Sequence, residues 1–486
     1  MKLKELIKDI PVLECTADPE LEISQVHYDS RKVTEGSLFV AVTGFASDGN
    51  RFIPMALSKG ASAVVTAKKP EGDIPYVLVE SDRMALALLG CNFFSHPARS
   101  MTMIGVTGTN GKTSTTLLLK QVLERTLGAK VGLIGTMANI VGDEEIPTER
   151  TTPESFDLQA LFARMRDAGC SHVVMEVSSH AVTLERIGGT HFDIAAFTNL
   201  TEDHLDFHKT MDAYCDAKAE LFRRCDKAVI NTDDSYAARM VDAASCPVLT
   251  TAVAGAGDLR AENLELLSEG ISFTAVCGDE TAQVHLPIPG KFTVYNALTV
   301  MGIAKQLGIS LSDCAEALKT ATGVKGRVEV VPTPGMPYSV LIDYAHTPDG
   351  LENVLSSVKD FCKGRVIGVF GCGGDRDPMK RPIMGEIGVR LSDIAIITSD
   401  NPRTEEPMAI IEDILKGVKQ EYGEYFVIED RRAAIRYAMD IAKKDDIIVL
   451  AGKGHETYQE IQGKKYHLDE REEVAAHLQE LRNQNG

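Results

Sequence analysis

Residues 104–113, which read IGVTGTNGKT, constrain the fold more than any other stretch of the chain. The apolar residues 103–106 predict a buried strand, and residues 113–127 have apolar side chains at helical spacing. Glycines at such a turn let backbone N–H groups face an anion, while Lys112 can reach terminal phosphates and the Thr113 hydroxyl can bind magnesium. The stretch predicts a phosphate-binding loop in an α/β domain.

One position departs from the strict form of this loop. The strict pattern has a glycine five residues before Gly111, where this chain has Val106. The alternative interpretation is a chance glycine turn. The order of strand, turn, lysine, hydroxyl and helix favours phosphate binding, because each feature falls where the mechanism needs it.

The length of the chain predicts several domains. The chain has 486 residues, which is too many for one hydrophobic core and suggests about three domains. We expect a small N-terminal α/β domain over residues 1–99, a central P-loop ATPase domain with a parallel sheet over 100–327, and a Rossmann-like C-terminal domain with a parallel sheet over 328–486. The predicted fold class is therefore three-domain α/β.

Charge and cysteine content exclude several classes of protein. The net charge of −19 argues against a nonspecific nucleic-acid binder. The ten cysteines contain no Cys-x-x-Cys pair, and no signal-like apolar run follows Met1. No stretch approaches about 18 consecutive apolar residues. We expect reduced thiols, a cytoplasmic monomer, and neither nucleic-acid binding nor membrane insertion.

Polar residues follow each predicted strand of the central segment. Glu176 ends one apolar run, and Asn199, Asp203 and His204 follow the next. Ligands of open α/β sheets bind beyond the carboxyl ends of the strands, so Glu176 and His204 are candidate magnesium ligands near the phosphate loop. The alternative for a histidine at a strand end is an ordinary hydrogen bond. Lys218, in a helical stretch over 214–223, has the pattern of a surface lysine.

The C-terminal segment repeats this arrangement. Strands are predicted at 339–343, 365–370, 394–398 and 446–451, and polar residues end each of them. Any one such cluster is more often a structural turn than a site. Four together predict a second parallel sheet with a ligand at its carboxyl edge.

Taken together, these residues resemble the Mur ligases, which use ATP to join an amino acid to a carboxylate. The resemblance covers nearly the whole chain, and the family's phosphate loop has the glycine spacing seen here. The matching motifs are TGTNGKT (107–113), EVSSH (176–180), TNLTEDHLD (198–206), AKAELF (217–222), Asn296 and GRVE (326–329).

The resemblance implies roles for the residues of the central segment. It implies that Lys112, Glu176, His204 and Lys218 are catalytic. It implies that magnesium is held by Thr113, Glu176, His204 and Lys218, the last as a carbamate, which can form only from a neutral amine. ATP would contact Gly108, Thr109, Asn110, Gly111, Lys112, Thr113, Ser114, Asn296, Arg327 and Asp343.

The acceptor implied by the resemblance is UDP-N-acetylmuramoyl-L-alanyl-D-glutamate. Its uridine nucleotide would contact Ser30, Phe45, Ala46 and Ser47, and its muramoyl peptide would contact Thr151, Thr152, Ser178 and Arg186. Relatives often have an asparagine before the paired threonines. This chain has Arg150 there, so we leave that position out of the predicted binding set.

The motif DNPR at residues 400–403 is similar to that of family members that add meso-diaminopimelate. Diaminopimelate differs from lysine by a second carboxylate, which an arginine can hold by two parallel hydrogen bonds. Arg376 and Arg403 are the candidates for this carboxylate. The remaining contacts of the amino acid are expected from Asp400, Asn401, Pro402, Gly452 and Glu456.

The implied reaction is ATP-dependent amide formation in peptidoglycan biosynthesis, with an acyl phosphate of the D-glutamate carboxylate as the intermediate. Three alternatives stay open: a lysine-adding ligase, a folylpolyglutamate synthetase and a P-loop regulatory or motor ATPase. Residues 400–403 and the full N-terminal segment argue against the first two. The last leaves the polar strand ends of the C-terminal segment without a purpose. No residue in the sequence identifies itself as the general base for the amine.

Overall fold

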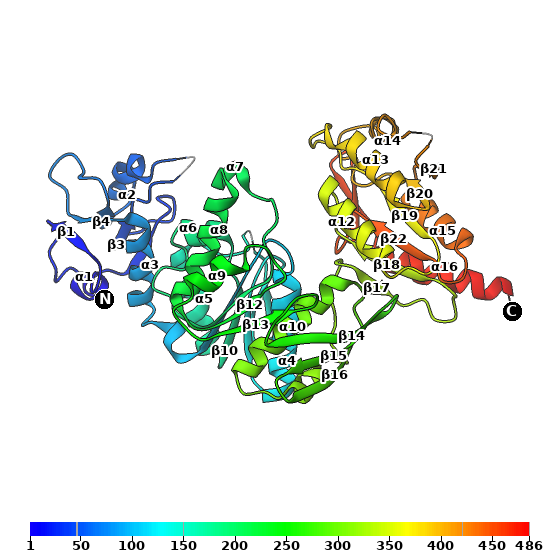
Figure 1. Cartoon of the computed structure of the whole chain (residues 1–486). Coiled ribbons are helices and arrows are strands. Elements are labelled where there is room, and N and C mark those ends of the chain that lie inside the picture. The colour runs from blue at the N-terminus through cyan, green and yellow to red at the C-terminus, as the bar shows by residue number, and fades with distance from the viewer. Residues whose placement is uncertain (45–46, 149, 420, 486) are drawn as a thin grey trace. The chain divides into compact units, whose positions relative to one another are not determined.

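A computed structural model of the chain describes residues 1–44, 47–148, 150–419 and 421–485 (Figure 1). The contacts of the chain divide it into two compact units. The first unit comprises residues 1–260 and 298–310, and the second comprises residues 261–297 and 311–486. Helix α10 (Lys291–Gln306) contributes residues to both units.

The first unit begins with a five-stranded sheet of order β1-β5-β4-β3-β2. β2 to β5 are parallel, and β1 pairs with β5 antiparallel. Alternate side chains of β3 and β4 enter two small cores on the two faces of this sheet. The strands are β1 (Val12–Cys15), β2 (Gln25–His27), β3 (Ser37–Val40), β4 (Ala61–Thr66) and β5 (Tyr76–Val79).

The first unit contains eight strands of a larger sheet, in the order β13-β12-β11-β6-β10-β7-β8-β9, and β14 (Leu259–Leu267) continues this sheet beside β13. Its strands are parallel from β13 to β7, and β8 and β9 extend it antiparallel. The strands are β6 (Thr102–Thr107), β7 (Val131–Ile134), β8 (Asn139–Val141), β9 (Glu144–Ile146), β10 (His172–Glu176), β11 (Phe192–Phe197), β12 (Cys225–Asn231) and β13 (Val248–Ala252).

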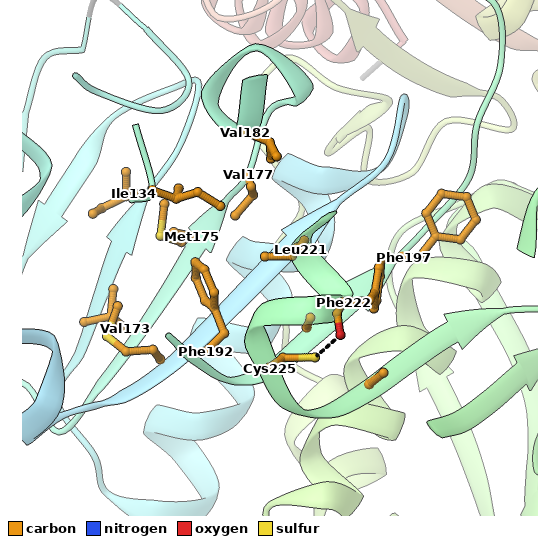
Figure 2. Packing of buried hydrophobic residues seen from close by; sticks show 14 of the residues in the cluster. Ile134, Val173, Met175, Val177, Val182, Phe192, Phe197, Leu221, Phe222 and Cys225 are labelled. Carbon is orange, nitrogen blue, oxygen red and sulfur yellow. Dashed lines mark hydrogen bonds between the residues drawn. The ribbon is translucent and has the colours of Figure 1, made fainter. Parts of the chain in front are cut away.

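One face of this sheet packs into a core that holds the strand ends in place (Figure 2). Val173 and Met175, two apart on β10, both enter the core, as the two-residue period of a strand requires. Phe192 of β11 and Phe222 are fully buried beside them, and the Cys225 thiol donates to the Phe222 carbonyl at 3.5 Å. The core therefore fixes the strands whose carboxyl ends carry the predicted polar residues.

Helices of the first unit connect its parallel strands. Gly111 and Gly128, both in the left-handed region, bound helix α4, and Leu119 and Leu123 on one of its faces are buried. The helices are α1 (Leu3–Leu6), η1 (Gly49–Phe52), α2 (Ile53–Ser58), α3 (Asp82–Phe93), η2 (Pro97–Ser100), α4 (Lys112–Leu127), α5 (Ser155–Asp167), α6 (Ser179–Thr183), α7 (Leu205–His208), α8 (Met211–Ala219), η3 (Glu220–Arg224) and α9 (Ala237–Ala243).

The second unit contains a six-stranded sheet of order β17-β18-β22-β19-β20-β21, parallel except for β17. Alternate residues of its central strands enter two cores, so both faces are covered. Its strands are β17 (Glu329–Val331), β18 (Ser339–Asp343), β19 (Val366–Phe370), β20 (Ile394–Ile397), β21 (Glu424–Val427) and β22 (Ile447–Ala451). β14 (Leu259–Leu267), β15 (Gly270–Cys277) and β16 (Glu280–Leu286) precede this sheet, and the hairpin β23 (Tyr458–Ile461) and β24 (Lys464–His467) follows it.

Helices alternate with the strands of the second unit. Helix α12 starts at Pro348 after the Thr347 side chain, which accepts from the Gly350 N–H, and α15 is capped by Asp430. The helices are α11 (Leu311–Leu318), α12 (Pro348–Lys359), α13 (Lys380–Leu391), α14 (Pro407–Leu415), α15 (Arg431–Ile441) and α16 (Glu470–Asn485).

The two predicted parallel sheets and the α/β class are confirmed. The helix expected over 214–223 differs, because α8 is α-helical only to Ala219 and continues as the 3₁₀ helix η3. All ten cysteines are free thiols, as expected. No described helix is both long and apolar enough to cross a membrane. The boundaries at residues 99 and 327 stay predictions.

Candidate active site

The phosphate loop lies between β6 and α4, as predicted. Gly108 and Gly111 have φ of +152° and +85°, a region that side chains disfavour. A Cβ atom on Gly108 would lie 1.9 Å from the Thr198 hydroxyl oxygen. Glycine is therefore required at position 108. Thr113 and Ser114 lie in the first turn of α4, where backbone N–H groups have no partner within the helix.

Residues that follow β11 hold this loop in place. The Thr198 hydroxyl donates to the Asn110 carbonyl at 2.7 Å, and the Asn199 side-chain oxygen accepts from the Asn110 N–H at 2.9 Å. The Thr109 N–H donates to the Asn199 carbonyl at 2.8 Å. The sequence placed Asn199 at a strand end, but only the pairing of β11 with β6 shows that it braces the loop.

Two lysine amines converge on one carbonyl of the loop. Lys112 Nζ donates to the Gly108 and Thr109 carbonyls at 2.9 and 2.8 Å, and Lys218 Nζ donates to the Gly108 carbonyl at 2.8 Å. The Lys218 side chain is 1% exposed, so its interpretation as a surface lysine is wrong. Burial, followed by the like charge of Lys112, lowers the pKa of Lys218 well below its ordinary value. The surroundings of Lys218 at the phosphate loop therefore favour its uncharged amine.

Tyr214 joins Lys218 to His204. The Lys218 amine lies 4.5 Å from the centre of the Tyr214 ring, and the His204 ring centre lies 6.1 Å from it. The Tyr214 hydroxyl forms a hydrogen bond with Thr109 Oγ1 at 3.1 Å, and burial raises the pKa of Tyr214 to about 12. The tyrosine, absent from the predicted set, is thus a neutral spacer between the loop and the two predicted metal ligands.

Glu176 lies buried at the end of β10. Its carboxylate accepts from the Thr136 N–H at 2.9 Å and from the Thr136 hydroxyl at 3.1 Å. A Cβ atom on Gly135 would lie 2.4 Å from Glu176 Oε1. Within the part of the chain that the structure describes, no three His, Cys, Asp or Glu side chains form a metal-binding group. The two predicted ligands Glu176 and His204 would offer one oxygen side chain and one nitrogen, whereas magnesium prefers oxygen ligands.

Most of the residues predicted to hold the acceptor peptide lie beside Glu176. The Thr152 hydroxyl donates to the Glu176 carbonyl at 2.8 Å and accepts from the Ser178 N–H at 3.2 Å. Arg186 donates to the Thr152 carbonyl at 3.1 Å. The Thr151 hydroxyl, for its part, is hydrogen-bonded to Thr136 at 3.0 Å.

Glu154, which was not predicted, forms ion pairs with three arginines next to the predicted peptide-binding residues. Arg186, Arg150 and Arg83 lie 3.5, 3.6 and 3.9 Å from its carboxylate oxygens. Arg150 and Glu154 also line a cavity of about 370 Å³. Three guanidinium groups therefore share the Glu154 carboxylate next to the predicted peptide-binding residues.

The residues predicted to hold the uridine nucleotide are only partly described. Ser30 is buried, with its hydroxyl 3.5 Å from the Met55 sulfur, and Ser47 is exposed. Phe45 and Ala46 lie outside the described residues. The described contacts do not join Ser30 to the phosphate loop.

Three residues predicted to contact ATP belong to the second unit. Asn296 is buried in α10. Arg327 stacks over the Tyr344 ring at 5.5 Å. Both oxygens of Asp343 accept backbone N–H groups, from Val328 and Ala345, at 2.8 Å each, and burial raises the pKa of Asp343. Asp343 therefore anchors the chain that leads from Arg327 into the sheet.

The predicted amino-acid residues meet at the carboxyl edge of the second sheet. Asn401 Nδ2 donates to Glu456 Oε2 at 2.8 Å across 55 residues of sequence. Asp400 Oδ1 accepts from the Asn401 N–H at 2.6 Å, while Asp400 Oδ2 is buried and has no hydrogen-bond partner among the described residues. A Cβ atom on Gly452 would lie 2.6 Å from that oxygen. One oxygen of the Asp400 side chain, two positions before Pro402, is therefore buried at this edge without a hydrogen bond from a described residue.

Arg403 lies beside this group. Its Nη1 donates to the Gly374 carbonyl at 2.7 Å, and its Nε lies 3.5 Å from Glu460. A Cβ atom on Gly373 would lie 2.9 Å from Arg403 Nη1 and 3.9 Å from the Arg376 side chain. The two predicted arginines thus approach the same glycine. Arg376 is exposed and Arg403 is half-buried.

Three models of protein families match the chain. The Mur ligase middle domain matches residues 106–304, the glutamate ligase domain of Mur ligases matches 326–454, and the catalytic domain of the Mur ligase family matches 22–84. The matches follow one another along the chain in the order of its three sheet regions.

Curated relatives match over nearly the whole chain. A UDP-N-acetylmuramoyl-L-alanyl-D-glutamate–2,6-diaminopimelate ligase from Clostridium acetobutylicum is 48% identical over 99% of this chain and 100% of its own length. Ligases of the same name from Clostridium botulinum and Bacillus velezensis are 48% and 42% identical, and the matches cover 95% and 99% of this chain and 96% and 99% of the relatives.

Solved structures agree. A UDP-N-acetylmuramoyl-L-alanyl-D-glutamate–2,6-diaminopimelate ligase superposes with a TM-score of 0.79 at 31% identity, covering 99% of both chains. The ligase from Acinetobacter baumannii that adds D-alanyl-D-alanine shares the fold, with a TM-score of 0.59 at 19% identity over 99% of this chain and 98% of its own. The chain therefore belongs to the Mur ligase family.

Proposed function

We propose that this protein is an ATP-dependent amide ligase of peptidoglycan biosynthesis. It joins meso-diaminopimelate to the D-glutamate of UDP-N-acetylmuramoyl-L-alanyl-D-glutamate and releases ADP and phosphate. The observation that carries the proposal is the group at residues 400–403, where Arg403 and the free oxygen of Asp400 lie beside Asn401 and Glu456. Relatives named for this reaction, alike over their full length, support it.

The first half of the reaction makes the carboxylate reactive. A carboxylate is a poor electrophile until one oxygen becomes part of a leaving group, and transfer of the γ-phosphoryl group of ATP to it forms an acyl phosphate. Lys112, beside the loop carbonyls, is placed to offset the charge of the moving phosphoryl group. Backbone N–H groups at the start of α4 would bind the other phosphates.

The lowered pKa of Lys218 favours the neutral amine, which is the form that addition to carbon dioxide requires. The addition forms a carbamate and releases one proton. Magnesium would be held by Thr113, Glu176, His204 and this carbamate, and it would neutralise the charge that develops on the phosphates.

The second half of the reaction depends on the second unit. The amine of diaminopimelate attacks the acyl carbonyl, and phosphate leaves as the amide forms. Arg403 and Arg376 would form charge-assisted hydrogen bonds with the second carboxylate of the amino acid. Asp400 and Glu456 would accept hydrogen bonds from its ammonium group. Lysine lacks that carboxylate, so its binding would leave Arg403 with only Glu460 and the Gly374 carbonyl as partners.

The proposal includes a cytoplasmic monomer with domains at 1–99, 100–327 and 328–486. Nucleotide substrates support the location. The three separate family matches, at 22–84, 106–304 and 326–454, support the three domains.

The test is phosphate release by the purified protein with ATP, magnesium and the UDP-linked acceptor. Meso-diaminopimelate, lysine and no amino acid are compared. We expect release with diaminopimelate alone. Equal release with lysine would keep the ligase and overturn the role of Arg403. Release without acceptor or amino acid would overturn the ligase in favour of a P-loop ATPase.

A further inference from the structure

Lys453 is a buried cation that the proposed reaction does not use. It lies two residues after the end of β22, between Gly452 and Gly454, and its side chain is 0% exposed. Its amine lies 3.1 Å from Asn401 Oδ1, 3.3 Å from Glu456 Oε2 and 5.7 Å from the centre of the Tyr458 ring. A fully buried ammonium is costly unless it is paired, so these contacts account for its position.

The contacts of Lys453 fix the orientation of the Asn401 amide. Asn401 Oδ1 accepts from Lys453 Nζ and from the Glu460 N–H at 2.9 Å. Both are donors only, so the amide oxygen must face them. The amide NH₂ is thereby directed to Glu456 Oε2, at 2.8 Å. A rotated amide would place its NH₂ against two donors and lose all three hydrogen bonds.

Lys453 also determines which oxygen of Glu456 can serve a ligand. Lys453 Nζ and Asn401 Nδ2 both donate to Glu456 Oε2. Glu456 Oε1 takes part in neither bond. The carboxylate is therefore held through one oxygen, and the other lies outside both bonds.

We propose that Lys453 is a positioning residue for the amino-acid substrate. It acts through Asn401 and Glu456, orienting the amide and the carboxylate before the amino acid arrives, and does not itself touch the substrate. This role rests on the proposed function, because it assigns the polar edge of the second sheet to diaminopimelate. Preorganised polar groups bind with less loss of side-chain entropy, so the effect of Lys453 falls on amino-acid affinity.

The test compares Lys453→Met with wild type in the phosphate-release assay. Methionine keeps the approximate length of the side chain and removes the charge and the donors. We expect the KM for diaminopimelate to rise about tenfold or more, because Glu456 loses the hydrogen bond from Lys453 and the Asn401 amide that donates the other is no longer held in place. The KM values for ATP and for the UDP-linked acceptor stay within about twofold, because Lys453 contacts neither phosphate loop nor acceptor residues.

The matched control is Lys465→Met. Lys465 also lies over the Tyr458 ring, at 4.0 Å, but it is exposed and makes none of the contacts to Asn401 or Glu456. We expect wild-type KM values from it. A rise equal to that of Lys453→Met would assign the effect to the tyrosine contact and overturn the proposal.

A double-mutant cycle with Asn401→Ala separates positioning from general loss of packing. If Lys453 acts through Asn401, the two substitutions together raise the KM for diaminopimelate by clearly less than the product of their separate effects. Independent effects would overturn the proposal. Where Lys453→Met does not fold, Lys453→Gln, which retains a donor without charge, replaces it, and a KM unchanged from wild type would overturn the proposal.

The outcomes separate this inference from the proposed function. Wild-type protein that releases no phosphate with diaminopimelate refutes the proposed function itself. Wild-type protein that is active, together with a Lys453→Met variant of unchanged KM, refutes only the positioning role.

Discussion

The carboxyl edges of the two parallel sheets each hold a buried lysine, and the surroundings of the two lysines differ. Lys218, in the first unit, donates to a backbone carbonyl and has the like charge of Lys112 beside it. Lys453, in the second unit, lies 3.3 Å from the Glu456 carboxylate. Their exposed fractions are 1% and 0%.

The difference shows that burial alone does not decide the chemistry of a lysine. Without a carboxylate partner, burial of Lys218 favours the uncharged amine, which is a nucleophile. Lys453 forms a buried ion pair with a carboxylate and a hydrogen bond with an amide oxygen. These contacts fix the orientation of the two partner side chains more than they add to net stability. The edge that holds Lys218 is thus suited to covalent modification of the lysine. The edge that holds Lys453 is suited to fixing the orientation of neighbouring side chains.

The largest expected effect comes from Lys218→Met. We expect kcat to fall by about a thousandfold with little change in the KM for diaminopimelate, because the substitution removes a group at the site of phosphoryl transfer. The measurement is amino-acid-dependent phosphate release. Lys453→Met should show the opposite pattern, a change in KM with kcat nearly intact.

Lys120→Met is the control for this substitution. Lys120 lies on α4 of the same unit and pairs with Glu124 at 2.5 Å. Activity near that of wild type is expected from it. If Lys218→Met also kept more than a tenth of wild-type kcat, the proposed difference in role between Lys218 and Lys453 would be wrong.

A smaller effect is expected from Arg403→Lys, which sharpens the comparison at the second edge. Lysine keeps the charge but cannot form two parallel hydrogen bonds to a carboxylate. We expect kcat/KM for diaminopimelate to fall about a hundredfold and its ratio to that for lysine to narrow. The control is Arg390→Lys, at a surface pair with Glu352. An unchanged preference for diaminopimelate over lysine would show that Arg403 does not determine the selectivity.

The smallest expected effect is on stability, from Arg365→Met. Arg365 donates to the buried Asp446 carboxylate from Nη2 at 2.7 Å and from Nε at 3.1 Å. Burial raises the pKa of Asp446, but the bonds from Arg365 outweigh it, so the pKa lies below its ordinary 3.8. Removing the guanidinium should lower the free energy of unfolding of the second unit by about 1 kcal/mol at pH 7.

The pH dependence gives the sign of this effect. A carboxylate with a lowered folded-state pKa stabilises the protein above its unfolded pKa, and the contribution disappears as the pH falls through the folded pKa. The difference in the free energy of unfolding between wild type and Arg365→Met, measured with urea, should therefore be constant from pH 7 to about pH 4 and shrink below pH 3.8. A difference that grows in acid would contradict it. Arg223→Met, at an exposed pair with Glu220, is the control.

The sequence predicted the phosphate loop in detail because its residues are contiguous. Gly108, Lys112 and Thr113 lie within six positions, and the strand and helix on either side have clear periods. The same local reasoning failed for Lys218, whose helix reads as amphipathic. Only the resemblance to a family gave that lysine a role.

Other site residues had no local signal. Tyr214 and Thr198 support the loop through hydrogen bonds that span 105 and 88 residues of sequence. Lys453, in a glycine-rich turn, was not singled out, because its contact with Asn401 spans 52 residues. Glycines and a lysine between a strand and a hairpin are typical of an ordinary turn.

By itself, the sequence determined two parallel-sheet domains, the phosphate loop and the strand ends that carry polar residues, because strand period, helix period and glycine turns are local properties. Only the tertiary structure decided the charge of the buried groups and the direction of their hydrogen bonds. Burial and pairing depend on which strands lie side by side, and neighbouring strands come from distant parts of the chain. The lowered pKa of Lys218 and the orientation of the Asn401 amide depend on strand order, which no short stretch of sequence contains.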